Sequence, residues 1–509
     1  MGTSGAICTS TNFGLTWTTN NAPNNVGWSS VTCSVDGTKL AAVGNGLIYV
    51  SSPVPQPKGS VVAWGVNNSG QATVPDNLGS ATAIAGSVYD SLAVKTDGTV
   101  AAWGLNDLDE TNVPAGLTDV VAVAASQELS LAIKNDRTLA WWGWSSYTNV
   151  IPSMSNVVAV AASQGNFYLA LQNNGIVTAW GANGYGQTSV PAGLSNVVAI
   201  AVGDSHSLAL KNDGTVAAWG GNVAFPTNHN QANIPAGISN VVAIAGGDTF
   251  SLALKIDGSV IGWPTDDQQV VQIPAGMSNV VAIAADYMHA LALTKDGNVW
   301  EWGTVGTGFL SYRVGLPSVT AVACGYYHSL AIVGDGSPTV VRQPWNQTLY
   351  AGFYTTMSAG VVGAPPLSCQ WQLNGTNVEG ATNVLLNLTN LQPANAGSYV
   401  LAVTNNLGFA ISSNATLTVI AIPPTITLQP TNQTVIAGSN VTFVAAVGAG
   451  PIPMTYQWQF NETNIDAATN LSITLNNVQP PNQGTYNIVV SNNFGVITSS
   501  NASLIVTGV

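Results

Sequence analysis

Hydrophobic and polar residues follow one repeating pattern through the first two-thirds of the chain. Each unit has a run of small apolar residues, a polar turn, a run of alternating apolar and polar residues, an Asp-Gly or similar pair, and a third run that ends in Trp; the stretch 197–220 is an example. A continuous apolar run predicts a strand packed on both faces, and alternation predicts a half-buried strand. Asp-Gly between such runs predicts a hairpin turn. The unit therefore consists of strands and contains no helix.

The spacing of tryptophan indicates that this unit is a true repeat. Seven Trp residues are separated by 39, 39, 38, 39, 44 and 39 positions, and all but one precede Gly; they are Trp64, Trp103, Trp142, Trp180, Trp219, Trp263 and Trp302. A fixed period of this length is typical of repeat architectures. Radial blades of four short strands give such a repeat few exposed sheet edges. We therefore predict an all-β chain whose largest part is a β-propeller.

Counting the units predicts how the propeller closes. Seven units of two apolar runs and a hairpin begin near Ala81 and end near Gly336, whereas the first Trp-ending run, 60–65, precedes all of them. The last unit, 319–336, has no Trp-ending run after it. We therefore expect seven blades, one of which takes its inner strands from 319–336 and its third strand from 61–65. This split blade joins the two ends of the ring.

The repeat resembles a known family. The stretches GDSHSLALKNDGTVAAWG and NGYGQTSVPAGL are similar to the regulator of chromosome condensation repeat family, and the likeness covers residues 59–337. Within that family, the short repeat with Ala-Trp-Gly and Val-Pro-Ala is most similar to secreted propeller-type β-lactamase inhibitors. The resemblance implies a seven-bladed β-propeller whose role can be protein binding. It specifies the fold more narrowly than the function, because such a scaffold hosts several activities.

The segment before the repeats, 1–52, has a different pattern. Residues 10–17, STNFGLTW, resemble the Asp-box turn of sialidase-like and sortilin-like propellers, with Asn12 in the Asp position. Residues 28–52 look like the strands that follow such a turn. One unit cannot form a propeller, so we expect this segment to be the last blade of an upstream array. The Asp-box turn is structural in those families and implies no sialidase chemistry.

Two tandem segments of similar sequence, 338–421 and 422–509, follow the repeats. PTVVRQPWNQTLYAG recurs as PTITLQPTNQTVIAG, and QWQLNGTN recurs as QWQFNETN. Both segments resemble immunoglobulin-like sandwiches, which have a core Trp and a tyrosine corner. The matching residues are Trp371 and Trp458, and Tyr399 and Tyr486. Two residues beyond each Tyr, Leu401 and Ile488 replace the second Cys, so we expect disulfide-free sandwiches that act as spacers.

Composition narrows the classes of function. The chain has 10 Lys and Arg against 23 Asp and Glu, a net charge of −13, and only 6% charged residues. A chain with so few cations cannot neutralise phosphates, which argues against nucleic-acid binding. No apolar run is long enough to span a membrane. Residues 1–10 lack the features of a signal peptide. We expect an extracellular or cell-surface fragment whose export signal lies outside this chain.

The chain offers little catalytic chemistry, and we expect neither a cofactor nor enzymatic activity. Three of the four His residues occupy one position in the repeat that other units fill with Asp, Leu or Phe, so we interpret it as a packing position. The residues at this position are Asp90, Leu129, Phe167, His206, Phe250, His289 and His328. His229 is expected in a loop. A Cys8–Cys33 disulfide is one alternative, whereas Cys324 and Cys369 are expected to be small buried residues.

One acidic cluster is a weak calcium candidate. Asp107, Asp109 and Glu110 lie close together in sequence, and calcium prefers several oxygen ligands on one loop. The alternative is a solvated loop tip. Asp266 and Asp267 form a weaker candidate.

Strand order predicts a partner-binding surface. The turns after first strands must emerge on the face opposite the Asp-Gly turns, and both chain connections lie on the Asp-Gly face. Aromatic residues and Met gather on the free face, on three blades that ring closure makes consecutive. We name this set the aromatic sector: Val88, Tyr89, Tyr287, Met288, Phe309, Leu310, Tyr312, Tyr326 and Tyr327. Exposed clusters of this kind are typical contact hot spots; the alternative is local packing over the channel mouth.

These observations favour a non-enzymatic extracellular binding or adhesion protein, with the propeller as a protein-binding module on an immunoglobulin-like stalk. A glycan ligand is an alternative to a protein partner. A nucleotide-exchange or regulatory scaffold is the alternative suggested by the repeat family, and the scarcity of Lys and Arg argues against it. A third alternative is the accessory region of a larger carbohydrate-active enzyme, whose catalytic module must lie outside this chain.

Overall fold

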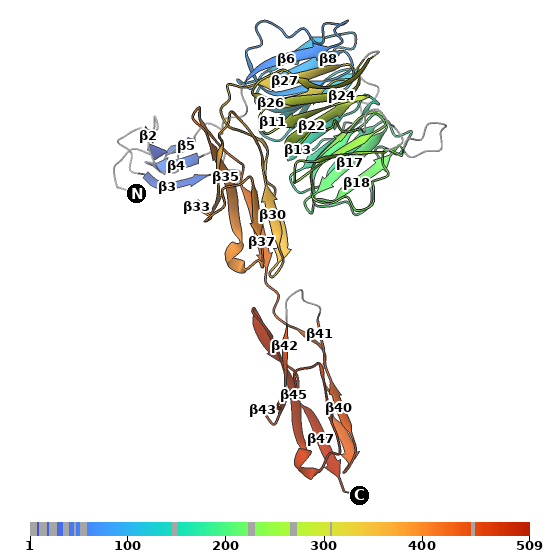
Figure 1. Ribbon diagram of the computed structural model, residues 1–509, viewed down its shortest axis with the longest axis vertical. Coiled ribbons are helices and arrows are strands. Elements are labelled where there is room, and N and C mark those ends of the chain that lie inside the picture. Colours follow the sequence, from blue (N-terminus) through green and yellow to red (C-terminus); the bar gives the residue numbers. More distant parts are fainter. Residues whose placement is uncertain are drawn as a thin grey trace. The chain divides into compact units, whose positions relative to one another are not determined.

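The computed structural model describes residues 59–508, apart from 145–150, 222–229, 265–271, 306–307 and 449–453. Within 1–58 the description covers the backbone of five short strands, and within 305–313 it covers backbone alone. The described residues form many small sheets and contain no α-helix; two 3-10 turns are present at Pro393–Asn395 and Pro480–Asn482 (Figure 1). The prediction of an all-β chain is confirmed.

The repeats form seven antiparallel units, each with a first, a second and a third strand. Their first strands are β7 (Ser80–Gly86), β10 (Val120–Ala125), β13 (Val157–Ala162), β16 (Val197–Val202), β19 (Val241–Gly246), β22 (Val280–Asp286) and β26 (Val319–Cys324). Their second strands are β8 (Asp90–Lys95), β11 (Leu129–Lys134), β14 (Phe167–Gln172), β17 (His206–Lys211), β20 (Ser251–Lys255), β23 (His289–Thr294) and β27 (His328–Val333). Their third strands are β9 (Val100–Gly104), β12 (Leu139–Gly143), β15 (Val177–Gly181), β18 (Val216–Gly220), β21 (Val260–Trp263), β24 (Val299–Val305) and β6 (Gly59–Gly65).

The first strands contact one another in a closed order, from β7 through β10, β13, β16, β19, β22 and β26 back to β7. The third strand of the β26–β27 unit is β6, which comes before all the other units in sequence. Strand β6 pairs antiparallel with β27, with Ser60 opposite Val333 and Gly65 opposite His328. It also pairs with the start of β7, which makes one six-stranded sheet of two units.

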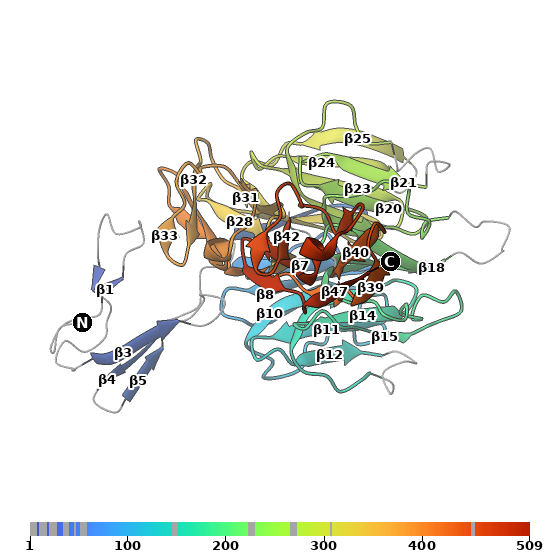
Figure 2. The same ribbon diagram turned by 90° about the horizontal axis from the view of Figure 1, so that it is seen from below.

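The expectation of four strands per blade is wrong for the three units whose segment after the third strand is fully described; these segments follow β6, β9 and β15. Within the described residues, only the unit that starts with β22 has a fourth strand, β25 (Gly308–Val314), which lies beside β24 (Figure 2). In the other units, the described parts of the segments after third strands form turns and bends. The segment 66–79, for example, is rich in Asn, Gly and Pro, which favour turns over strands.

Burial differs between first and second strands in a way that reverses the sequence prediction. The first strands, predicted to pack on both faces, are mostly half-buried, as in β13 and β16. The second strands, predicted to be half-buried, are fully buried along almost their whole length, as in β11 and β17. Their polar positions are satisfied internally: the Ser207 hydroxyl donates to the Gln187 carbonyl at 2.7 Å. A buried hydroxyl with a partner costs little, so alternation here does not indicate an exposed face.

In four units the repeating Trp donates a hydrogen bond to the loop that precedes the unit. Trp219 Nε1 donates to the Gln187 carbonyl at 2.9 Å, and this carbonyl also accepts the Ser207 hydroxyl. The same pair of bonds converges on Gln71, Glu110 and Gln231 in three other units. The Gly after Trp has a positive φ, and at Gly104 a Cβ would lie 2.4 Å from the Tyr89 carbonyl oxygen. The Trp-Gly pair is therefore required for local geometry.

The segment 422–509 forms a sandwich of short strands. One sheet has the order β39 (Gln433–Ile436), β47 (Ala502–Thr507), β45 (Gly484–Asn492), β42 (Thr455–Phe460) and β43 (Thr463–Asn464), with β46 (Gly495–Thr498) beside β45; the other described pairs are β38 (Ile426–Leu428) with β41 (Ala446–Val447) and β40 (Val441–Val444) with β44 (Ser472–Leu475). Trp458 is fully buried opposite Ile488. The Tyr486 hydroxyl donates to the Asn482 carbonyl at 2.9 Å. This bond is the one expected of a tyrosine corner.

The segment 338–421 repeats this arrangement. Strand β32 (Ser368–Leu373) pairs with β35 (Gly397–Thr404), which places buried Trp371 opposite buried Leu401. Its other strands are β28 (Thr339–Arg342), β29 (Gln347–Tyr350), β30 (Thr355–Ser358), β31 (Gly360–Val362), β33 (Thr376–Asn377), β34 (Leu385–Leu388), β36 (Phe409–Ile411) and β37 (Ala415–Ile420). Leu401 and Ile488 occupy the position at which immunoglobulin domains carry the second Cys of their disulfide.

Two compact units divide the chain. The first comprises Met1–Trp345, Ser358–Leu386 and Tyr399–Ala415, and the second comprises Asn346–Met357, Asn387–Ser398 and Thr416–Val509. The N-terminal segment contributes β1 (Cys8–Thr9), β2 (Thr18–Thr19), β3 (Trp28–Cys33), β4 (Leu40–Gly44) and β5 (Leu47–Val50). The predicted Asp-box residues 10–17 and the side chains of Cys8 and Cys33 lie outside the described residues.

Candidate functional site

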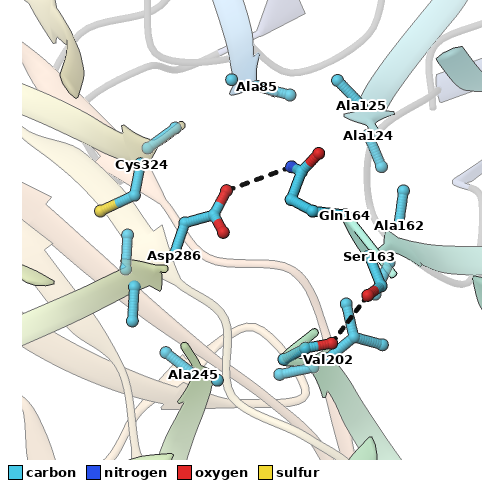
Figure 3. A pocket seen from close by; sticks show the side chains of 18 of the residues that line it. Ala85, Ala124, Ala125, Ala162, Ser163, Gln164, Val202, Ala245, Asp286 and Cys324 are labelled. Carbon is cyan, nitrogen blue, oxygen red and sulfur yellow. Dashed lines mark hydrogen bonds between the residues drawn. The ribbon is translucent and has the colours of Figure 1, made fainter. Parts of the chain in front are cut away.

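The seven first strands surround a central cavity of about 260 Å³. Most of its wall consists of Ala, Val and Ile side chains, because the small apolar runs of the repeat face inward here (Figure 3). The polar side chains that line it lie at the ends of the first strands or just after them; they are Ser163, Gln164, Asp204 and Asp286. A polar ring at the end of an apolar wall is the part of the cavity that can orient a ligand.

A hydrogen bond crosses this cavity. Gln164 Nε2 donates to the Asp286 carboxylate at 3.2 Å, and the two side chains come from the turns after β13 and the end of β22 (Figure 3). The backbone N–H of Tyr287 also donates to Asp286, at 2.8 Å. Burial nevertheless raises the pKa of Asp286 above its usual value, and the nearby Asp248 adds to the increase.

Asp204 is the second carboxylate of this polar ring. Burial raises its pKa well above the usual value, and the charges of Asp286 and Asp248 raise it further. Burial and mutual repulsion therefore favour the protonated forms of Asp204 and Asp286, and a positive group placed beside them would favour their ionisation. None of the residues that line the cavity is Lys or Arg.

A smaller mouth pocket of about 200 Å³ adjoins the central cavity and shares Gln164 and Asp204 with it. Its other lining residues are Val88, Tyr89, Gln127, Tyr326 and Tyr327. Three tyrosine rings pack beside it: Tyr287 stacks on Tyr326 with centroids 3.8 Å apart, and Tyr327 meets Tyr326 edge-on at 4.6 Å. Burial and then the Asp204 charge raise the pKa of Tyr326, so its hydroxyl stays neutral at physiological pH.

The structure brings together most, and not all, of the predicted aromatic sector. Tyr89, Tyr287, Met288, Tyr326 and Tyr327 are half-buried around the mouth pocket or on the turns beside it. Val88 is a correction, because only 5% of its side chain is exposed and it forms pocket wall.

The remaining members of the sector lie elsewhere in the fold. Phe309, Leu310 and Tyr312 were expected on a loop, and they are part of strand β25. In their sheet β25 is separated from β22 by two strands, so its backbone is roughly 14 Å from the strand that leads to Tyr287. Their side chains lie outside the described residues.

The predicted packing position has a hydrogen-bonding role that the sequence analysis missed. His206 Nε2 lies 2.8 Å from Ser251 Oγ in the next unit, and Ser251 Oγ donates to the Gln231 carbonyl. The serine proton is thus already used, so His206 must be the neutral tautomer that donates from Nε2. His328 and Ser91 repeat the arrangement at 2.7 Å. Burial lowers the pKa of His206 to about 3.

The other candidates do not form a site among the described residues. The Glu110 carboxylate accepts the Leu108 N–H at 2.7 Å and the Asp109 carboxylate accepts from the Asn112 amide at 2.6 Å, so both are used within the loop. In the described part of the chain, no group of three or more His, Cys, Asp or Glu side chains has a metal-binding arrangement. Cys324 and Cys369 are free thiols, and Cys324 is buried. His229, Asp266 and Asp267 lie outside the described residues.

One signal in the sequence could have identified the acidic ring. Aligning the turns after the first strands places Asp204 and Asp248 at the position that Tyr287 and Tyr326 occupy in later units. Because Tyr326 lines the mouth pocket, Asp residues at the same position should face it as well. Asp286 is harder to find, since it stands one position earlier, where other units have Ser or Gly.

Comparison with known families supports both parts of the chain. Residues 197–224 match the regulator of chromosome condensation (RCC1) repeat, and residues 423–492 match the immunoglobulin domain. These matches confirm the two broad resemblances at those residues. No described helix has the length and apolar character needed to cross a membrane.

Curated relatives share short stretches with the chain. Roundabout homolog 3 of Homo sapiens is 28% identical over 188 residues, which is 32% of this chain and 14% of that protein. Hemicentin-1 of Mus musculus is 25% identical over 31% of this chain and 3% of its own length. Endoglucanase C of Cellulomonas fimi is 29% identical over 24% of this chain and 11% of its own length. The chain therefore spans a small fraction of each of these relatives.

Among solved structures, the titin domains z1z2 in complex with telethonin are 25% identical, cover 34% of this chain and 98% of their own, and have a TM-score of 0.23. Tandem Ig repeats of Dlar are 23% identical, cover 34% of this chain and 100% of their own, and have a TM-score of 0.17. Scores this low carry no argument about function.

Proposed function

We propose that residues 59–337 form a seven-bladed β-propeller that binds a protein partner through the tyrosines around the mouth pocket. The closed order of first strands and the pairing of β6 with β27 support the propeller. The chain then acts as a non-enzymatic binding or adhesion protein outside the cell, and the segments 338–421 and 422–509 act as immunoglobulin-like spacers. The low content of Lys and Arg and the immunoglobulin-domain match support this setting.

The stacked tyrosines carry the proposal. Tyr287, Tyr326 and Tyr327 are half-buried by one another, so each still presents part of its ring beside a pocket. Tyrosine is enriched at binding hot spots because its rigid ring buries much area with little loss of conformational entropy. Rings held by mutual stacking are also pre-organised, which lowers the entropic cost of binding.

Selection from a displayed library of constrained peptides tests this proposal. The immobilised full chain should select peptides whose binding is lost in the double variant Tyr326→Ala/Tyr327→Ala. Tyr354→Ala is the matched control, because Tyr354 is 77% exposed and lies in the segment 338–421. Melting curves establish that both variants are folded. Selected peptides that bind the double variant as tightly as the wild type would overturn the proposal.

A second candidate is the accessory region of a larger carbohydrate-active enzyme. The match to endoglucanase C favours it, since that relative is named for action on a glucan. Affinity electrophoresis of the full chain in gels that contain carboxymethyl cellulose tests this candidate. Retardation relative to a non-binding control protein supports it, and unchanged mobility at all polymer concentrations refutes it for this polymer.

A further inference from the structure

The mouth pocket has both acidic and aromatic residues in its lining. Asp204 and Gln164 line it together with Tyr326 and Tyr327. Asp204 and Tyr326 line the same small pocket, so a group that enters it can meet both the carboxylate and the ring. Carboxylates beside an aromatic face form the surroundings in which an organic cation binds, through charge and through the ring quadrupole.

We propose that this pocket binds the basic side chain of a lysine or arginine that the protein partner presents. In this arrangement the Tyr326 ring contacts the cationic group and the Asp204 carboxylate neutralises its charge, while Asp286 lines the adjoining central cavity. The inference rests on the proposed function and specifies the chemistry of the partner at the same site.

The size of the pocket favours one side chain over a larger ligand. Its volume of about 200 Å³ is below the roughly 300–1,000 Å³ of pockets that hold drug-sized molecules. Asp204 and Gln164 also line the central cavity, so the pocket is polar where the two cavities meet. A flexible aliphatic stem with a charged tip can contact the tyrosine rings along its length and the Asp204 carboxylate at its tip.

The described basic residues lie away from the carboxylates that line the two cavities. Neither the central cavity nor the mouth pocket has a Lys or Arg among its lining residues. Four described lysines lie at the opposite ends of the second strands, where they pair with Asp residues of the hairpin turns; the pairs are Lys95–Asp97, Lys134–Asp136, Lys211–Asp213 and Lys255–Asp257. At the hairpin-turn end of the units each of these Asp residues is paired with a lysine. At the end that carries the mouth pocket no lysine or arginine lines the pocket beside Asp204, so that end is complementary to a positive group.

Binding of two short probes to the full chain tests the inference. One probe is acetyl-Gly-Gly-Lys-Gly-Gly-amide, and the other replaces Lys by norleucine, which keeps the aliphatic stem and removes the charge. We expect saturation-transfer NMR to detect the lysine peptide at millimolar concentration, with an affinity at least about tenfold higher than that of the norleucine peptide. Equal affinity of the two probes would overturn the inference.

Two variants locate the binding at the pocket. Asp204→Asn should lower the affinity for the lysine peptide by about tenfold or more, since the neutralising charge is lost. Tyr326→Leu should lower it by a few fold, because the aromatic face is lost while an apolar wall remains. The matched control is Asp213→Asn at the opposite end of the same unit, which should bind as the wild type does. Unchanged affinity in folded Asp204→Asn, or an equal loss in Asp213→Asn, contradicts the site.

The peptide selection separates this inference from the proposed function. If selected peptides depend on Tyr326 and contain no enrichment of Lys or Arg, the cation site is wrong and the proposed function stands. If the lysine probe binds at Asp204 and the selection yields no peptide that depends on Tyr326, the proposed function is wrong and the cation site stands.

Discussion

Replacing His206 by Phe isolates the energetic role of one buried imidazole. His206 is fully buried, and Phe250 occupies the same position in the next unit, where it is also fully buried. Phe fits this position in the repeat, because Gly247 leaves space for its ring as Gly203 does for that of His206. The variant loses the Nε2–H bond to Ser251, which costs about 1 kcal/mol, and it also removes a buried ring nitrogen. Near pH 7 we expect a change in unfolding free energy of about 1 kcal/mol or less.

At lower pH the unfolding free energies of the wild type and of His206→Phe should diverge. The pKa of His206 is 6.5 in its ordinary state and about 3 when buried in the folded chain, so below pH 6.5 the unfolded chain binds a proton that the folded chain does not. Stability from this group therefore falls as the pH falls from 6.5 towards 3. Each pH unit is worth 1.36 kcal/mol, so between pH 6.5 and pH 5 the wild type should lose about 2 kcal/mol relative to His206→Phe.

Hydrogen exchange of the strand 206–211 in the full chain measures this difference, because it reports the opening free energy of that unit. Burial raises the pKa of Asp90 to about 7, so this acid lowers the stability of the chain as the pH rises. The effect is the same in the wild type and in His206→Phe, and it cancels when the two proteins are compared at each pH. Phe250→Leu provides a control without a titrating group, and its difference from the wild type should not change with pH. A wild-type minus His206→Phe difference that stays constant from pH 7 to pH 5 would refute a buried neutral imidazole.

Three further substitutions test other parts of the structure. Gly203→Ala should destabilise the chain by about 3 kcal/mol in thermal unfolding, because the new Cβ would lie 2.1 Å from the Gly247 carbonyl oxygen. Gly184 faces open space, so Gly184→Ala should be neutral. Equal effects of the two substitutions would contradict the close packing at Gly203. Asp286→Asn should stabilise the chain increasingly as the pH rises from about 4 to about 7, because over this range the unfolded carboxyl ionises while the buried one keeps its proton; the same shift in melting temperature at pH 4 and at pH 8 would count against this assignment. Tyr486→Phe should cost about 1 kcal/mol through loss of the bond to Asn482, and exposed Tyr354→Phe should cost nothing measurable in denaturant titrations.

The strands were predictable because periodicity and turn chemistry act locally. Asp-Gly pairs such as Asp213-Gly214 mark hairpins whose registers follow directly, as between β17 and β18. The number of strands in each unit was harder to predict, because the segments after the Trp have neither regular alternation nor a continuous apolar run. The burial of the second strands was predicted wrongly for a similar reason. Ser207 has a polar side chain and was expected to face solvent, and only its hydrogen bond to the Gln187 carbonyl explains how it can be buried.

The candidate site was predictable only in part. Sequence counting placed Tyr287 and Tyr326 on neighbouring units, and their rings are stacked. The acidic half of the mouth depends on distances across a cavity, such as the contact of Gln164 with Asp286 over 122 positions in sequence. A linear pattern carries no information on such distances unless the positions of all seven turns are compared with one another.

The register of β6 against β27 has a mechanical consequence. Ser60 lies opposite Val333, so the chain enters and leaves this ladder at the same end. A tensile load applied at Ser60 and Val333 acts perpendicular to the two strands. It therefore breaks their hydrogen bonds one pair at a time, in the unzipping geometry, and does not load all of them at once as shear would. Under a load applied at Ser60 and Val333, this pair of strands should therefore separate at low force.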